Sequence, residues 1–148
     1  MALGDADLRV WLYTTFLATG RCPSVAEMAA EFATSPAQVA AALRRMHDAH
    51  MLVLQPSGEV LMANPLSAVP TPFPVLLSDG RMFYGNCIWD ALGILAMVGS
   101  EGSIPTTCGD CGDALTVKVE NGQAHCADPV QLHFALPARQ WWDNIVFN

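Results

Sequence analysis

Cys87 and Asp90 are the residues whose types and spacing could support chemistry most directly. They stand three positions apart, so on a helix they would share one face. A cysteine in the first turn of that helix would meet the positive end of the helix dipole, which lowers a thiol pKa and enriches the thiolate. Asp90 lies among apolar residues, and burial favours its protonated form. A thiolate beside a carboxyl that carries a proton is a small acid–base site. The alternative is a buried cysteine and an aspartate that only stabilises the helix start.

Three further cysteines in the second half are candidate metal ligands or auxiliary thiols. Cys108 and Cys111 form a C-x-x-C turn with a glycine after each cysteine, the pattern of a zinc knuckle. One such pair supplies two ligands, and Cys126 with His125 or His133 could complete a Cys₃His zinc site. The alternatives are a reduced pair that binds a soft metal ion and a pair with no role.

Two tryptophans near the C-terminus, Trp141 and Trp142, precede Asp143. Their simplest role is aromatic packing in a core or an interface. The sharper hypothesis is that Trp142 or Asp143 lines the pocket around Cys87.

The secondary structure expected around these residues indicates an α+β domain over residues 75–148. Apolar residues 75–77 and 82–84 flank an Asp-Gly turn, which is typical of a hairpin. A helix is expected over residues 87–97, with Asn86 as its cap and Gly99 after its end. Further strands are expected at 115–119, 131–136 and 144–147. One buried helix would then pack on a small sheet that is mostly antiparallel.

Residues 1–64 predict a winged helix-turn-helix module. Helices are expected to start after Asp7, Ser24 and Ser35, all capping residue types, and a hairpin follows over 51–62. If the module bound DNA, the third helix would present Gln38, Arg44 and Arg45. The alternative is that it only packs against the second half. Four prolines within residues 65–74 predict a stiff, extended connector between the two.

Composition narrows the class of protein. The chain holds 7 Lys and Arg against 14 Asp and Glu, a net charge of -7, which argues against nucleic-acid binding. No apolar run reaches the roughly 18 residues of a membrane span. The acidic N-terminus is unlike a secretory signal, so we expect no targeting segment. Five cysteines, an odd number, then argue against a disulfide framework. In a cytoplasmic protein these thiols would be free, catalytic or metal-bound.

Residues 83–92, FYGNCIWDAL, resemble the stretch of the organomercurial (alkylmercury) lyases that carries their first active-site cysteine and their aspartate. The surroundings are similar as well. That family has an N-terminal winged-helix-like domain, a connector like residues 69–72, and a turn like residues 79–81 before the aromatic pair. A cysteine placed like Cys108 also precedes a strand like residues 115–117. The resemblance covers nearly the whole chain from about Leu8 and keeps the order of the elements.

The resemblance implies a fold and a reaction. The fold would be a winged-helix-like module followed by a helix-plus-sheet domain like that of organomercurial lyase. Cys87 would take the mercury of a small organomercury compound, because mercury(II) is soft and prefers thiolates. Asp90 would relay a proton to the leaving carbon, releasing a hydrocarbon and thiolate-bound Hg²⁺. This reaction requires no cofactor, although Zn or Hg could bind at the cysteines.

The chain departs from that family in one respect. The family has a second active-site cysteine just before an aromatic-rich strand near the C-terminus, and residues 140–147 contain none. The chain ends at Asn148, ahead of the closing segment that such enzymes carry. Cys108, Cys111 and Cys126 are the available replacements. We therefore hold four hypotheses: an organomercurial lyase-like enzyme, the same fold with another small-molecule substrate, a soft-metal (Hg, Zn or Cu) binding protein, and, least favoured, a metal-responsive transcriptional regulator.

Overall fold

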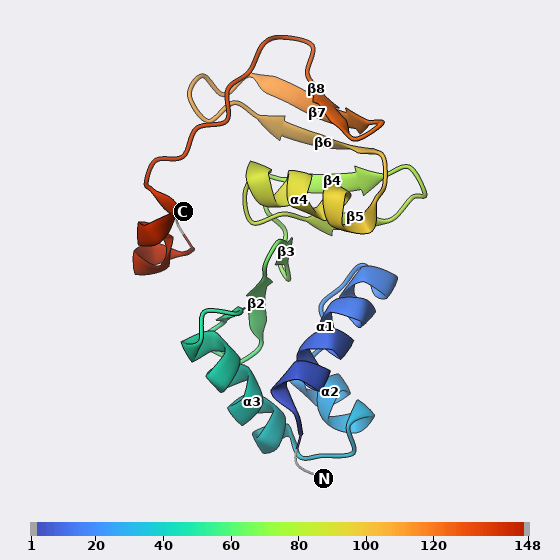
Figure 1. Ribbon diagram of the computed structural model, residues 1–148, viewed down its shortest axis with the longest axis vertical. Coiled ribbons are helices and arrows are strands. Elements are labelled where there is room, and N and C mark those ends of the chain that lie inside the picture. Colours follow the sequence, from blue (N-terminus) through green and yellow to red (C-terminus); the bar gives the residue numbers. More distant parts are fainter. Residues whose placement is uncertain (1–2, 147–148) are drawn as a thin grey trace.

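The computed structural model describes residues 3–146 as a helical part and a sheet part that follow one another along the long axis (Figure 1). The first part has three helices and a small antiparallel sheet of order β1-β2-β3. Its elements are α1 Asp5–Thr19, α2 Val25–Glu31, α3 Pro36–Asp48, β1 Val53–Leu54, β2 Val60–Ala63 and β3 Leu66–Ser67. The three helices and the hairpin predicted from the sequence are present, but α1 begins at Asp5 with Gly4 as its N-cap, so the predicted start after Asp7 is wrong. The assignment of this part as a winged helix stays a prediction.

Serine caps begin the second and third helices, as predicted. The Ser24 side chain accepts a hydrogen bond from the Glu27 backbone N–H, and the Glu27 carboxylate accepts one from the Ser24 backbone N–H at 2.8 Å. Ser35 and Gln38 form the same capping box at α3. Each box satisfies backbone donors that a helix start otherwise leaves unpaired.

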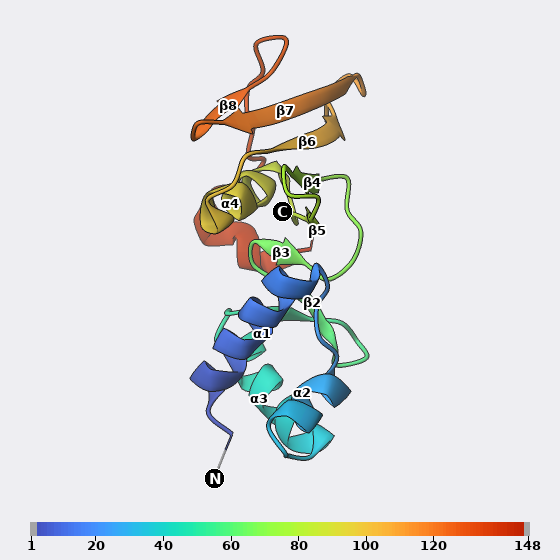
Figure 2. The same cartoon turned by 90° about the vertical axis from the view of Figure 1, so that its right-hand side faces the viewer.

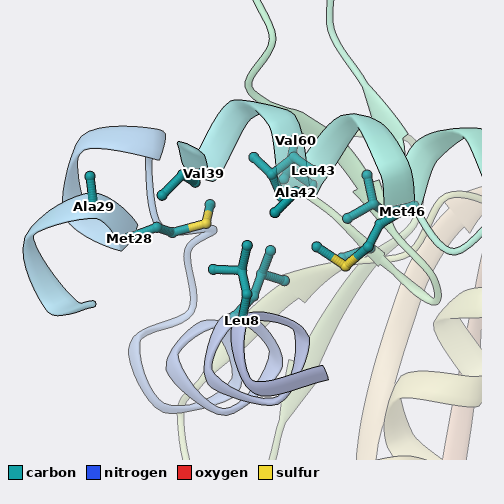
Figure 3. Close-up of a cluster of buried hydrophobic side chains, with 11 residues drawn as sticks. Leu8, Met28, Ala29, Val39, Ala42, Leu43, Met46 and Val60 are labelled. Carbon is teal, nitrogen blue, oxygen red and sulfur yellow. The ribbon is translucent and has the colours of Figure 1, made fainter. Parts of the chain in front are cut away.

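The three helices enclose an apolar cluster (Figure 3). Leu8 of α1 lies opposite Val39 and Leu43 of α3, and Met28 of α2 closes one end. All four side chains are fully buried. Packing of these faces, more than helix propensity, therefore holds the short α2 in place.

The predicted connector is extended, but it is also part of the junction between the two parts. Leu66–Ser67 form β3, which pairs with β2, and Leu66 also bridges to Gly85 in the second part. The Thr71 hydroxyl donates a hydrogen bond of 2.6 Å to the Gly85 carbonyl. Both views place β3 between the two parts (Figures 1 and 2). The proposed division at residues 64 and 74 stays a prediction.

The second part is one helix on an antiparallel sheet of order β5-β4-β6-β7-β8, which confirms the predicted α+β class. Ile94 and Leu95 of the helix pack with Val75 and Ile104 of the sheet in a buried cluster. Its elements are β4 Pro74–Leu77, β5 Met82–Tyr84, α4 Ile88–Val98, β6 Gly102–Thr107, β7 Ala114–Glu120 and β8 Gln123–His125.

Strand β6 was missed at the sequence level because Gly102, Ser103 and Pro105 are typical of a loop. Its neighbours explain how it tolerates a proline. β4 pairs only with Gly102 and Ser103, whereas β7 pairs along the whole of β6 and places Thr116 opposite Pro105. At Pro105, β6 is paired with β7 on one side only. Proline has no backbone N–H to donate, and on the unpaired side none is needed.

Two strands expected near the C-terminus are wrong. Residues 131–136 have no regular secondary structure, and Ala138–Asn144 form a 3₁₀ helix, η1, where the second strand was expected to begin. The rest of that strand reaches Phe147, which lies outside the described residues. The aromatic residues that suggested strands instead make ring contacts with α4 and with each other. Trp89 of α4 meets the Phe134 ring edge-on, and the ring centroids of Phe134 and Trp141 are 5.3 Å apart.

Helix α1 connects the two parts. Leu8 and Leu12 belong to the first apolar cluster, whereas Phe16, one turn further on, is buried in the second. The Arg81 guanidinium also donates a hydrogen bond to the Leu17 carbonyl at the end of α1. The orientation of the second part relative to the first is thus held by packing as well as by the chain connection. No helix within residues 3–146 is long and apolar enough to cross a membrane.

Candidate functional site

Cys87 is the residue immediately before α4 and serves as its N-cap, with an extended backbone at φ −144°. The prediction that Asn86 caps this helix is wrong, because the Asn86 amide is engaged with other partners. Asp90 lies in the first turn of the helix, three positions after Cys87. The predicted pair is therefore brought together at the start of one helix.

The predicted activation of Cys87 by the helix dipole is wrong in its net effect. Burial raises the pKa of the Cys87 thiol, and the nearby Asp90 carboxyl adds to the rise. Hydrogen bonds from the backbone N–H groups of Asp90 and Trp89 act in the opposite direction but do not outweigh burial. The Cys87 thiol therefore holds its proton to a higher pH than an exposed cysteine.

Asp90 behaves as the sequence predicted. The residue is half-buried, and burial raises the pKa of its carboxyl. The Asn86 side-chain amide donates a hydrogen bond to Asp90 Oδ2 at 2.9 Å, which limits that rise by favouring the carboxylate. The result is a carboxyl that holds its proton to a higher pH than an exposed aspartate, beside a protonated thiol.

Asn86 is a site residue that the sequence analysis did not identify. Besides Asp90, its Nδ2 donates to Asn64 Oδ1 at 3.0 Å and contacts the Pro65 carbonyl at 3.3 Å. The Tyr13 hydroxyl in turn donates to the Asn64 carbonyl at 2.8 Å. Asn64 lies 22 positions before Asn86 and 51 after Tyr13, so no local pattern could have revealed this chain of contacts.

Gly85 allows α4 to approach this network. A Cβ atom at Gly85 would lie 2.5 Å from the backbone nitrogen of Ala91 and 2.9 Å from its Cβ. Only a residue without a side chain fits between the end of β5 and the first turn of the helix. This glycine belongs to the FYGNCIWDAL stretch, and the requirement for it became visible only from the packing.

Cys108 and Cys111 lie in the tight turn between β6 and β7. The Cys108 backbone N–H donates to the Asp113 carbonyl at 2.8 Å, and the Gly112 N–H donates to the Cys108 carbonyl at 2.9 Å. Hydrogen bonds from the backbone N–H groups of Cys111 and Asp110, together with the Cys111 thiol, lower the pKa of Cys108. At Cys111 the Asp113 backbone N–H has a lowering effect, but hydrogen bonds to Cys108 and Asp113 leave the pKa raised.

The predicted four-ligand zinc site is not assembled. Within residues 3–146, no group of three or more His, Cys, Asp or Glu side chains is arranged to hold a metal ion. His125 and Cys126 do line the same groove as Cys108 and Cys111, but His133 does not. All five cysteines are free.

The C-terminal aromatic residues connect α4 to the first part. Trp142 stacks on His50, just after α3, with ring centroids 4.2 Å apart and planes 5° apart. η1 accordingly lies between α4 and the first part (Figure 2). Asp143 is exposed. The hypothesis that Trp142 or Asp143 lines the Cys87 pocket stays a prediction.

Comparison with known proteins identifies the family. Residues 66–147, more than half of the chain, match the sequence profile of the alkylmercury lyase family, MerB. The chain belongs to the alkylmercury lyase family. The matched span includes Cys87, Asp90 and the Cys108–Cys111 turn, whereas residues 1–65 lie outside it.

A solved structure supports the alkylmercury lyase fold. The chain is similar to the crystal structure of the mercury-bound form of MerB2, with a TM-score of 0.64 and 18% sequence identity. The match covers 82% of this chain and 60% of that chain, so the chain spans less than two thirds of the MerB2 structure. At this identity the likeness shows the fold alone. No curated protein matches the sequence.

Proposed function

We propose that this alkylmercury lyase family member cleaves the carbon–mercury bond of small organomercury compounds by protonolysis. The observation that carries the proposal is the half-buried Asp90, whose pKa burial raises, beside the Cys87 thiol at the start of α4. A metal-binding sulfur and a proton donor at the start of the same helix are what this reaction needs. Membership of the family supports the choice of mercury as the metal.

The residues divide the steps between them. The Cys87 thiol releases its proton to solvent, and its sulfur bonds the mercury of R–Hg⁺. The Asp90 proton then passes to the carbon, and the electron pair of the breaking carbon–mercury bond forms the new carbon–hydrogen bond. A hydrocarbon leaves, Hg²⁺ stays on the Cys87 sulfur, and the Asp90 carboxylate takes a proton from solvent. No atom changes its oxidation state through an external oxidant or reductant.

The Asp90 environment suits this role for a physical reason. A proton donor works best when its pKa approaches the working pH, and burial raises the Asp90 pKa in that direction. Asn86 hydrogen-bonds Asp90 Oδ2, which leaves Oδ1 to carry the proton. Asn86 would therefore orient the donor without touching the substrate.

The C-terminal stretch lacks the second cysteine of the family, and we propose that a small thiol from solution supplies the second sulfur. Such a thiol would also remove the Hg²⁺ from Cys87 after cleavage. This requires reduced protein thiols, which fits the five free cysteines and a reducing compartment such as the cytoplasm.

We also propose that the first part is a winged-helix-like packing module without a DNA-binding role. On α3, Gln38 is used in the capping box and Arg45 forms an ion pair with Asp5, which leaves Arg44 of the three residues that were expected to face DNA. The first part instead contacts the second part of the chain. The Tyr13 hydroxyl bonds the Asn64 carbonyl beside Asn86, and Phe16 is buried in the apolar cluster of the second part.

The test is incubation with methylmercury or phenylmercury and excess small thiol, with hydrocarbon release as the readout. We expect release by wild type and by the control Cys126→Ser, and none by Cys87→Ser or Asp90→Asn. Stoichiometric mercury binding without release by wild type would exclude the lyase and favour a soft-metal binding protein. Undiminished release by Asp90→Asn would overturn the proposed proton donor.

A further inference from the structure

The β6–β7 turn carries a second pair of sulfur atoms that the proposed lyase reaction does not use. We propose that Cys108 and Cys111 form a separate binding site for a thiophilic divalent metal ion such as Hg²⁺, held between two thiolates. The site requires no contribution from Cys87 or Asp90, so it stands or falls independently of the lyase activity.

The turn already presents the two cysteines to one another. Backbone hydrogen bonds close it at both ends, from Cys108 N–H to the Asp113 carbonyl and from Gly112 N–H to the Cys108 carbonyl. Gly112 has a φ of 78°, a conformation that favours glycine and turns the chain back into β7. Both cysteines line the same groove beside β6 and β7, so their side chains open onto one shared space.

The turn is also open to solvent. Cys111 is exposed, and a Cβ placed at Gly109 would meet nothing within 4 Å. An incoming ion, or a small thiol that delivers one, can therefore reach both sulfurs from solvent.

The number of available donors selects the type of ion. Zinc in structural sites takes four ligands, and no group of three or more donor side chains within residues 3–146 is arranged to hold a metal. A soft ion that is satisfied by two thiolates suits the pair instead. Binding would break two S–H bonds and form two metal–sulfur bonds, with release of two protons and no redox change.

Cys126 provides a matched control for the pair. It lines the same groove as Cys108 and Cys111 but is not hydrogen-bonded to either in the turn. A site of two thiolates should tolerate its loss, whereas a site of three should not.

The experiment uses the full-length Cys87→Ser chain, loaded with Hg²⁺, washed with excess of a monothiol and analysed for bound mercury. We expect one retained ion per chain. Adding Cys108→Ser or Cys111→Ser should weaken retention on the order of 100-fold, since one thiolate lacks the effective concentration of a linked pair. Adding Cys126→Ser should leave retention unchanged, and circular dichroism checks that each variant is folded.

Two results would overturn the inference. One is a folded Cys87→Ser chain that retains no mercury against the monothiol. The other is a loss with Cys126→Ser as large as that with Cys108→Ser, which would indicate a three-thiolate site. Both measurements use inorganic Hg²⁺ and a chain that lacks Cys87. Neither result therefore depends on whether wild type is a lyase.

Discussion

The two sulfur sites of this chain are built in opposite ways. Cys87 and Asp90 are half-buried at the start of α4, and Asp90 belongs to a hydrogen-bond network that draws on α1, the β2–β3 turn and Asn86. Cys108 and Cys111 lie in a surface turn whose hydrogen bonds stay within residues 108–113. Burial raises the Cys87 pKa, whereas local N–H groups lower that of Cys108. The same side chain is thus prepared for different tasks by its surroundings.

The largest expected effect separates the sites by their proton donor. Asp90 is the proposed donor of the α4 site, so Asp90→Asn should lower hydrocarbon release about 10²- to 10⁴-fold, the usual contribution of a positioned general acid. Cys108→Ser should leave release unchanged. Burial opposes the Asp90 carboxylate, so the Asn variant should be at least as stable as wild type at neutral pH. Thermal unfolding at pH 7 tests this, and a lower Tm would assign the loss to unfolding instead.

The next effect concerns thiol reactivity. Alkylation at neutral pH should modify Cys108 at least about 100-fold faster than Cys22, since the thiolate is the nucleophile. Burial raises the pKa of Cys22 to about 12, whereas that of Cys108 is lowered. Cys87 should react at an intermediate rate. Peptide mass spectrometry over a time course gives the order, and modification of Cys87 before Cys108 would contradict the comparison.

A third prediction compares two glycines, one at each site. Gly85→Ala should destabilise the chain by about 1–3 kcal/mol or more, because its Cβ would overlap the backbone of Ala91. Gly109→Ala, where a Cβ meets nothing within 4 Å, should change stability by less than about 0.5 kcal/mol. Urea unfolding of both variants measures the difference. Equal midpoints would show that α4 does not need the close approach.

The smallest expected effect is the loss of one amide. Asn86→Ala removes the hydrogen bond that lowers the Asp90 pKa, so that pKa should rise further. The Asp90 carboxyl would keep its proton to higher pH, so the alkaline limb of the pH–rate profile should shift to higher pH. The lost contacts to Asn64 and Asp90 should cost about 1 kcal/mol. A fall in activity without any shift of the limb would mean that Asn86 only supports the fold.

Local sequence features predicted the parts of the structure that depend on neighbouring residues. The serine caps of α2 and α3, the Asp-Gly hairpin of β4 and β5, and the C-x-x-C turn were all recognisable, because each is held by hydrogen bonds within a few positions. The spacing of Cys87 and Asp90 likewise placed them together once a helix was expected there. Residue types in this stretch also carried the likeness to alkylmercury lyases.

Tertiary structure decided the features that depend on burial and distant partners. Pro105 became part of a strand because β7 alone pairs with it there, and the aromatic C-terminal segment packed on α4 instead of joining the sheet. The Cys87 pKa moved against the helix-dipole expectation, since desolvation outweighs two backbone hydrogen bonds. Asn64 and Asn86 meet only after the two parts dock. Desolvation and long-range hydrogen bonds are properties of the packed chain, so spacing along the sequence cannot determine them.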